Sequence, residues 1–283
     1  MGMIVPAKGR IACRGSSETC HLSVARGSLI AMCGRYVLRT DASALAGQLG
    51  ITQPSLFERV ADREPDYNVA PTVPVVAAME RRPRGAEADA QAVRELREVR
   101  WGLIPSWAKD RSIGSKMFNA RIESVTEKPS FRKAFQKRRC ILPADGYYEW
   151  YRPQAPKAAK QPFFIHDASG DALAFAGLYE LWRDPEVADK EDPAAWLWSA
   201  TILTTASVGD LSRIHDRMPV VVPHGAYDEW LDPDFGSGEG ETDALLRLLD
   251  SGRDLKLETY PVSTAVNSVK NNGPQLVDRV EAE

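Results

Sequence analysis

The stretch Cys140-Ile141-Leu142-Pro143-Ala144-Asp145-Gly146-Tyr147-Tyr148-Glu149-Trp150 decides the fold, because it joins an apolar run to an aromatic run through a turn signal. Short apolar or aromatic runs bounded by an Asp-Gly dipeptide are typical of strands that end at a turn. We therefore expect two strands here, with a tight connection between them.

Similar strand-like runs recur on both sides of this stretch. They lie at residues 73–79, 99–104, 163–166, 173–181, 196–205, 218–222 and 257–262. Helical patterns are fewer. Thr40 or Asp41 can cap a helix that carries Leu45 and Leu49 and ends at Gly50. Two more helices are expected at residues 130–138 and at residues 243–249, the latter capped by Thr242.

Strands outnumber helices and do not alternate with them regularly, which predicts an α+β fold rather than a doubly wound one. We expect a single domain over residues 32–283, with a largely antiparallel, barrel-like mixed β-sheet surrounded by helices. Residues 1–31 show no sustained period of 2 or 3.6 and are expected to be an unstructured extension. This extension is either an upstream region included by a misplaced start or a short propeptide.

Composition excludes several classes of protein. The 283 residues are 43% hydrophobic and carry a formal net charge of -3, which argues against coating nucleic acid through bulk charge but permits a local basic groove. The four cysteines form no CxxC pair and no zinc-type spacing with histidine, so neither a metal, a cofactor nor a disulfide framework is expected. No run approaches the roughly 18 apolar residues of a membrane span, and a soluble cytoplasmic monomer is expected.

Cys33 directly follows an internal methionine, Met32, so removal of that methionine would make it the N-terminal residue. Its α-amine, with a reference pKa of about 7.7 to 8.0, and its thiol, near about 8.5, would both be partly deprotonated near neutrality. Such a 1,2-aminothiol condenses with an aldehyde to an imine, which the tethered sulfur closes to a thiazolidine. The alternative is a small buried apolar residue that opens a strand.

Four further residues could carry chemistry. Asn119 and Arg121 lie two apart and share a face of an extended segment, where they could orient an amine and hold a phosphate. A turn asparagine and a surface arginine are the alternative. Glu149 stands among aromatic residues that would raise its pKa and make it a general acid, or it is an exposed strand residue. His215 suits proton transfer during imine chemistry, or it is structural.

Taken together, six segments resemble the SRAP family, named for SOS response-associated peptidases, whose members crosslink themselves to abasic sites in DNA. The segments occur in family order and span nearly the whole chain after residue 31. They are Met32-Cys33-Gly34-Arg35, Tyr67-Asn68-Val69-Ala70-Pro71-Thr72, Trp101-Gly102-Leu103-Ile104-Pro105 with Trp107, Phe118-Asn119-Ala120-Arg121, Pro143 to Trp150, and His215-Asp216-Arg217-Met218-Pro219.

The resemblance implies a DNA-damage response protein that senses abasic sites in single-stranded DNA and shields them by a covalent link through Cys33. It implies that Asn119 positions the amine or the opened sugar, Glu149 acts as acid and base in ring opening, and His215 assists imine formation and reversal. It also implies that Arg35, Arg121 and Arg217 contact phosphates and that Thr204 lies at the active site. A base could stack on Trp101, Trp107 or Trp150, for which core packing is the alternative.

The extension before Met32 departs from the family pattern, because an acylated amine cannot form an imine. Two alternatives to the crosslinking function stay open. One is a cysteine-dependent peptidase that removes its own leader, with Cys33 as nucleophile and His215 or Glu149 as base. The other is a non-catalytic single-strand binder.

Overall fold

The computed structural model describes residues 34–281 apart from residues 83–84, 86, 88–89, 154–158, 251 and 253–254. All the described residues belong to one compact unit, Met32–Glu283. The predicted extension at residues 1–31 and the predicted nucleophile Cys33 lie outside the described residues.

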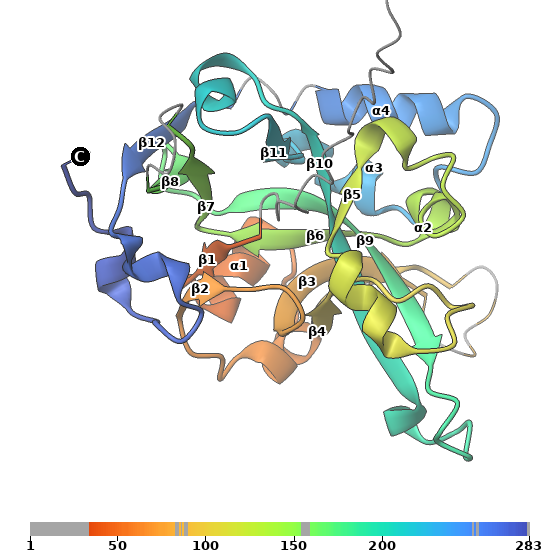
Figure 1. Cartoon of the computed structure of the whole chain (residues 1–283). Helices are drawn as coiled ribbons and strands as arrows, with labels where there is room; N and C mark the ends of the chain where they lie inside the picture. Colours follow the sequence, from red (N-terminus) through yellow and green to blue (C-terminus); the bar gives the residue numbers. More distant parts are fainter. Residues whose placement is uncertain are drawn as a thin grey trace, which may run out of the picture. The chain divides into compact units, whose positions relative to one another are not determined.

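A closed ring of five strands forms the centre of this unit (Figure 1). β10 pairs with β4 in parallel, whereas the β4–β3, β3–β6, β6–β9 and β9–β10 pairs are antiparallel. The ring closes because β9 pairs with both β6 and β10. The five strands are β3 (Pro74–Arg81), β4 (Val93–Trp101), β6 (Arg139–Ala144), β9 (Leu173–Arg183) and β10 (Trp196–Ala206).

Close packing inside the ring requires a glycine in β9. A Cβ atom on Gly177 would lie 2.2 Å from Leu142 Cδ1 and 2.9 Å from Cys140 Sγ, both on the neighbouring β6. Cys140 is fully buried, and burial raises the pKa of its thiol. The ring interior is therefore a packed core, as the apolar runs predict.

Two short strands extend the ring beside β10. β5 (Asn119–Arg121) runs parallel to β10, and β11 (Arg217–Pro219) runs antiparallel to it. A second sheet is antiparallel throughout, in the order β12-β8-β7-β1-β2. Its strands are β1 (Tyr36–Leu38), β2 (Asp66–Val69), β7 (Gly146–Tyr151), β8 (Gln161–Asp167) and β12 (Leu257–Pro261).

The predicted turn at Asp145 carries the chain from the ring into the second sheet. The Asp145 carboxylate accepts hydrogen bonds from the backbone N–H groups of Arg39 and Thr40, at 2.6 and 3.0 Å. It also accepts one from the Thr40 hydroxyl at 2.5 Å. This side chain therefore fixes the segment between β1 and the first helix.

Four short helices accompany the sheets: α1 (Ala42–Gln48), α2 (Arg132–Lys137), α3 (Tyr227–Leu231) and α4 (Glu241–Asp250). Asp41 caps α1 as predicted, accepting the Ala44 N–H at 2.9 Å. The prediction that Thr242 caps the last helix is wrong, because α4 begins one residue earlier. Its Glu241 carboxylate accepts the N–H groups of Gly236 and Gly238 instead.

Short 3-10 helices fill many of the connections. They are η1 (Pro54–Leu56), η2 (Glu58–Val60), η3 (Arg111–Lys116), η4 (Ile122–Ser124), η5 (Pro193–Ala195), η6 (Gly209–Arg213), η7 (His224–Ala226), η9 (Thr264–Asn267) and η10 (Pro274–Val277). The predicted fold class, an α+β domain with a largely antiparallel, barrel-like mixed sheet, is confirmed.

The strand predicted at residues 99–104 lies earlier in the chain. β4 begins at Val93 and ends at Trp101, because Gly102 turns the chain with φ of 132° and packs against another glycine. A Cβ on Gly102 would lie 2.5 Å from the Gly114 carbonyl oxygen. The close approach of these two backbones ends the strand.

Candidate functional site

Several predicted site residues share one face of the β5–β10–β11 group. The register pairs Asn119 with Ile202 and pairs Thr204 with both Arg121 and Pro219. Paired residues on adjacent strands point to the same face, and so do residues two apart on one strand. Asn119, Arg121, Thr204 and Arg217 therefore lie on a common face, where Arg121 is exposed and Asn119 half-buried.

Arg217 is held inside this face by a carboxylate. Its Nη1 and Nη2 donate to Glu123 Oε1 and Oε2 at 2.5 and 2.8 Å, and Nη2 also donates to the Thr204 carbonyl at 2.6 Å. Hydrogen bonding from Arg217 lowers the pKa of Glu123. The positive charge of Arg217 is therefore already matched by a negative charge, and its phosphate contact stays a prediction.

Thr204 supports Arg217 and has no exposed surface of its own. Its side chain is 0% exposed, and its hydroxyl accepts a long hydrogen bond from Arg217 Nη2 at 3.4 Å. In this structure Thr204 is therefore a buried residue that positions Arg217, and its predicted role at the DNA site would act through that arginine.

His215 lies next to this pair, with its side chain 13% exposed. Its Nδ1 accepts the backbone N–H of Arg217 at 3.1 Å, so in the neutral ring the proton is on Nε2. The Asp216 Oδ1 atom also lies 3.1 Å from Nδ1 and would accept its proton in the imidazolium. Nδ1 has a partner in either state, which suits a group that exchanges protons.

A second group of residues lies where β1 meets β7. The register pairs Tyr36 with Tyr147, and the N–H of Tyr148 donates to the Arg35 carbonyl at 3.0 Å. Continued by one more residue, this register sets Gly34 opposite Glu149. Glu149 is 2% exposed, which rules out the alternative of an exposed strand residue.

Trp101 links the two groups from within the core. Its ring centroid lies 5.2 Å from that of Tyr36 and 6.0 Å from that of Phe118, and its Nε1 donates to the Phe118 carbonyl at 2.9 Å. Because the indole is 0% exposed, the predicted stacking of Trp101 on a DNA base is wrong for this structure. Trp107, by contrast, is 59% exposed.

Sequence reasoning missed Asn68, which holds Arg35. Arg35 Nη1 donates to Asn68 Oδ1 at 2.8 Å and to the Val266 carbonyl at 2.9 Å. Partial burial lowers the pKa of Arg35, yet a guanidinium stays charged at ordinary pH. The motif Tyr67-Asn68 was a signal for this contact, but local sequence does not show that its partner is Arg35.

Trp150 is fixed by the same C-terminal segment. Its Nε1 donates to Asn267 Oδ1 at 2.7 Å. Figure 1 shows this segment, drawn in dark blue, beside β1 and β2. Arg35 and Trp150 are thus held by polar, uncharged partners, unlike Arg217.

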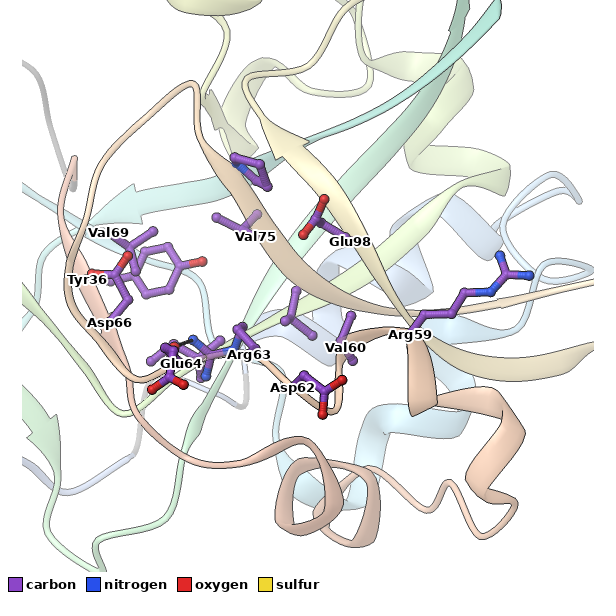
Figure 2. A pocket seen from close by; sticks show the side chains of 13 residues that line it. Tyr36, Arg59, Val60, Asp62, Arg63, Glu64, Asp66, Val69, Val75 and Glu98 are labelled. Atoms are coloured by element: carbon purple, nitrogen blue, oxygen red, sulfur yellow. Dashed lines mark hydrogen bonds between the residues drawn. The ribbon is translucent and has the colours of Figure 1, made fainter. Parts of the chain in front are cut away.

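A pocket of about 310 Å³ lies beside Tyr36 (Figure 2). Its walls combine apolar side chains such as Val60 and Val75 with charged ones such as Arg63 and Asp66. Among the described residues the buried Tyr36 hydroxyl has no hydrogen-bond partner, and burial raises its pKa. None of the predicted site residues lines this pocket, which borders the second group only through Tyr36.

The described residues contain no metal-binding cluster and no helix that could span a membrane. Among residues 34–281, outside the short gaps, no three His, Cys, Asp or Glu side chains gather as metal ligands would. In the same part of the chain no helix has the length and apolar character needed to cross a bilayer.

Comparison with known proteins gives consistent matches. The abasic site processing protein YoqW of Bacillus subtilis (strain 168) is 41% identical over 247 residues, which cover 87% of this chain and 99% of the relative. The abasic site processing protein HMCES of Xenopus tropicalis is 31% identical over 278 residues, covering 87% and 78%. A crystal structure of a protein from Bacteroides thetaiotaomicron has the same fold, with a TM-score of 0.65 at 24% identity, covering 88% of this chain and all of that one.

The family model described as SOS response associated peptidase (SRAP) matches residues 32–269, which include every predicted site residue. The match begins at Met32, directly before Cys33. This chain belongs to the SOS response associated peptidase (SRAP) family.

Proposed function

We propose that this protein processes abasic sites in single-stranded DNA by forming a covalent crosslink through Cys33, as the N-terminal residue of the active chain. The β1–β7 register carries the proposal, because it sets the residue after Cys33 opposite the buried Glu149. Relatives named as abasic site processing proteins, which align over 87% of the chain, support the same assignment.

The reaction is a condensation that releases one water. An abasic deoxyribose is a cyclic hemiacetal, and protonation of its ring oxygen by Glu149 opens it to the aldehyde. The neutral α-amine of Cys33 adds to C1′ and loses water to give an imine. The thiol then adds across the C=N bond, with its proton passing to nitrogen, and closes a thiazolidine. Tethering gives this last step an effective molarity of order 10⁵ M or more.

The other site residues have supporting roles. Asn119 positions the amine or the opened sugar, and His215 moves protons as the imine forms and reverses. Arg35 and Arg121 hold phosphates of the single strand, which needs no bulk positive charge on the protein. Trp107 and Trp150 offer stacking surfaces for unpaired bases.

Denaturing electrophoresis with an oligonucleotide that contains one abasic site tests the proposal. Protein started at Met32 should give a shifted band that survives denaturation, and Cys33→Ala should give none. Equal adduct yield from Cys33→Ala would refute the proposal. Binding of intact DNA without any adduct would identify a non-catalytic single-strand binder.

A second proposal is that the protein removes its own leader, with Cys33 as nucleophile and His215 or Glu149 as base. The family description as a peptidase and the segment before Cys33 support it. Cleavage before Cys33 would create the free amine that the crosslink requires. Intact mass of the full-length chain tests it: loss of residues 1–32 that depends on Cys33 is expected, whereas an uncleaved long form would indicate a misplaced start.

In the cell we expect a cytoplasmic monomer that joins the nucleoid when bound to DNA and acts within the SOS response to DNA damage. The crosslink shields the lesion from strand cleavage by β-elimination. The imine step resembles the chemistry of DNA lyases, and self-cleavage would make the protein a hydrolase as well.

A further inference from the structure

We propose that the loop 266–271 is a nucleic-acid contact in its own right, in which Val269 and Lys270 meet the strand beside Arg35 and Trp150. This inference rests on the proposed function and adds a wall to the same site. It also gives a role to the Tyr67-Asn68 motif, which the crosslinking chemistry does not use.

Asn68 fixes the loop in place. This residue is 5% exposed, and its Nδ2 donates to the carbonyls of Ser268 and Asn271, at 2.9 and 2.8 Å. Within the loop, Asn271 Nδ2 donates to the Ala265 carbonyl at 2.8 Å. Because a buried amide satisfies several loop carbonyls at once, the loop has a defined conformation.

Arg35 and Trp150 lie against the same loop. The Val266 carbonyl accepts from Arg35 Nη1, and the Asn267 side chain accepts from Trp150 Nε1. Val266 itself is 0% exposed and packs in a small core with Tyr148 and Phe164. The loop is therefore anchored to Arg35, directly before β1, and to β7, the strand that carries Glu149 and Trp150.

At the tip of the loop the exposed groups suit a single strand. Val269 is 58% exposed, and its neighbour Lys270 is also exposed. Residues 262–277 contain no acidic residue, so nothing within this segment neutralises Lys270. One exposed valine is ordinary on a protein surface. A valine on a rigid loop, beside a lysine and next to Arg35 and Trp150, offers an apolar surface for a base and a charge for a phosphate.

Equilibrium binding of an intact oligonucleotide, measured by fluorescence anisotropy over a range of salt concentrations, tests the inference. Each phosphate contact contributes about 0.7 to the slope of log K against log salt for a single strand. Lys270→Ala should reduce the slope by about that amount. Val269→Ala should weaken binding about three- to tenfold at unchanged slope, because it removes two partly covered carbon atoms.

Lys190→Ala is the matched control. Lys190 is an exposed lysine next to Trp196, the first residue of β10, whereas the site residue Thr204 lies near the other end of that strand. Lys190→Ala should leave the slope of log K against log salt unchanged. If Lys190→Ala and Lys270→Ala reduced the slope equally, the effect would come from the net charge of the protein and not from a local phosphate contact. That result would overturn the inference.

Wild-type protein separates the two proposals. If it gives no adduct with abasic DNA, the proposed function fails. If it forms the adduct while Val269→Ala and Lys270→Ala both bind like wild type, the contact by loop 266–271 alone is overturned.

Discussion

Arg217 and Arg35 are held in opposite ways, although both are predicted to contact DNA. Arg217 forms a bidentate ion pair with Glu123, whereas Arg35 donates to the neutral amide of Asn68 and to a backbone carbonyl. A carboxylate cancels the charge that it orients, and an amide orients the same group while leaving the charge intact. We therefore propose that Arg35 is an electrostatic contact for DNA, whereas the guanidinium of Arg217 mainly holds Glu123 and the Thr204 carbonyl.

The largest effect is expected on the rates at which the adduct forms and reverses. Glu149 lies on the Arg35 side and His215 on the Arg217 side. Loss of a general acid typically costs about 10² to 10⁴ in rate. We expect Glu149→Gln to slow single-turnover adduct formation by that factor, measured on quenched denaturing gels. His215→Gln should slow reversal of the adduct more than its formation. Formation at the wild-type rate in Glu149→Gln would exclude it as the acid.

A charge-balanced pair of variants tests the two arginines directly. Arg35→Met removes one unmatched positive charge, and the double variant Glu123→Gln with Arg217→Met removes one charge of each sign. We expect the salt slope of single-strand binding to fall by about 0.7 in Arg35→Met and to stay the same in the double variant. Equal loss of slope in both would show that Arg217 also binds a phosphate.

The free energy of unfolding should also depend on the contact between Arg35 and Asn68. Arg35→Met leaves the buried Asn68 oxygen without its arginine donor, which should lower the free energy of unfolding by about 1 to 3 kcal/mol. Urea unfolding of wild type, Arg35→Met and the Glu123→Gln, Arg217→Met double variant at neutral pH measures this change in free energy. No loss in Arg35→Met would mean that Asn68 does not depend on Arg35.

The Glu123–Arg217 pair also predicts a pH dependence. The pKa of Glu123 is lowered in the folded state, so its contribution to stability is present above the unfolded pKa of about 4.3 and is lost as pH falls through the folded value. The difference in unfolding free energy between wild type and Glu123→Gln should therefore shrink below about pH 4.3. The effect is small because the carboxylate is half-exposed. A difference that is constant from pH 7 to acid would contradict the pairing.

The smallest effect is expected in the core between the two regions. Tyr36→Phe removes a buried hydroxyl that has no partner among the described residues and keeps the edge-to-face contact of the ring with Trp101. We expect the free energy of unfolding to stay equal or to rise by about 1 kcal/mol, with adduct formation unchanged. A clear loss of stability would show that the hydroxyl has a partner, such as a bound water in the adjoining pocket.

The sequence predicts the strands best where apolar residues run continuously, as in β6, β9 and β10. It misses the first half of β4, where Arg94 and Glu95 look like a charged surface. In the structure, Arg94 pairs with Glu80 and Arg81 with Glu95 across β3 and β4, so these charges are satisfied on the outside of the ring. Charge pairs across two neighbouring strands leave no apolar period by which the sequence would reveal the strand.

The candidate site, too, could be predicted from the sequence only in part. Motifs identify Asn119, Glu149 and His215 as candidates, since their residue types suit imine chemistry. The partners that orient the arginines could not be predicted, because Glu123 lies 94 residues from Arg217 and Val266 lies 231 residues from Arg35. These contacts depend on the closed ring and on the return of the C-terminal segment to β1.

Intact mass spectrometry of the purified adduct tests the central claim most directly. Protein that begins at Cys33 should give the summed mass of protein and abasic oligonucleotide less one water, with the modification on residue 33 after digestion. Protein with an acetylated Cys33 amine should give no such species. An adduct on any other residue, or one formed equally by the acetylated protein, would contradict the account.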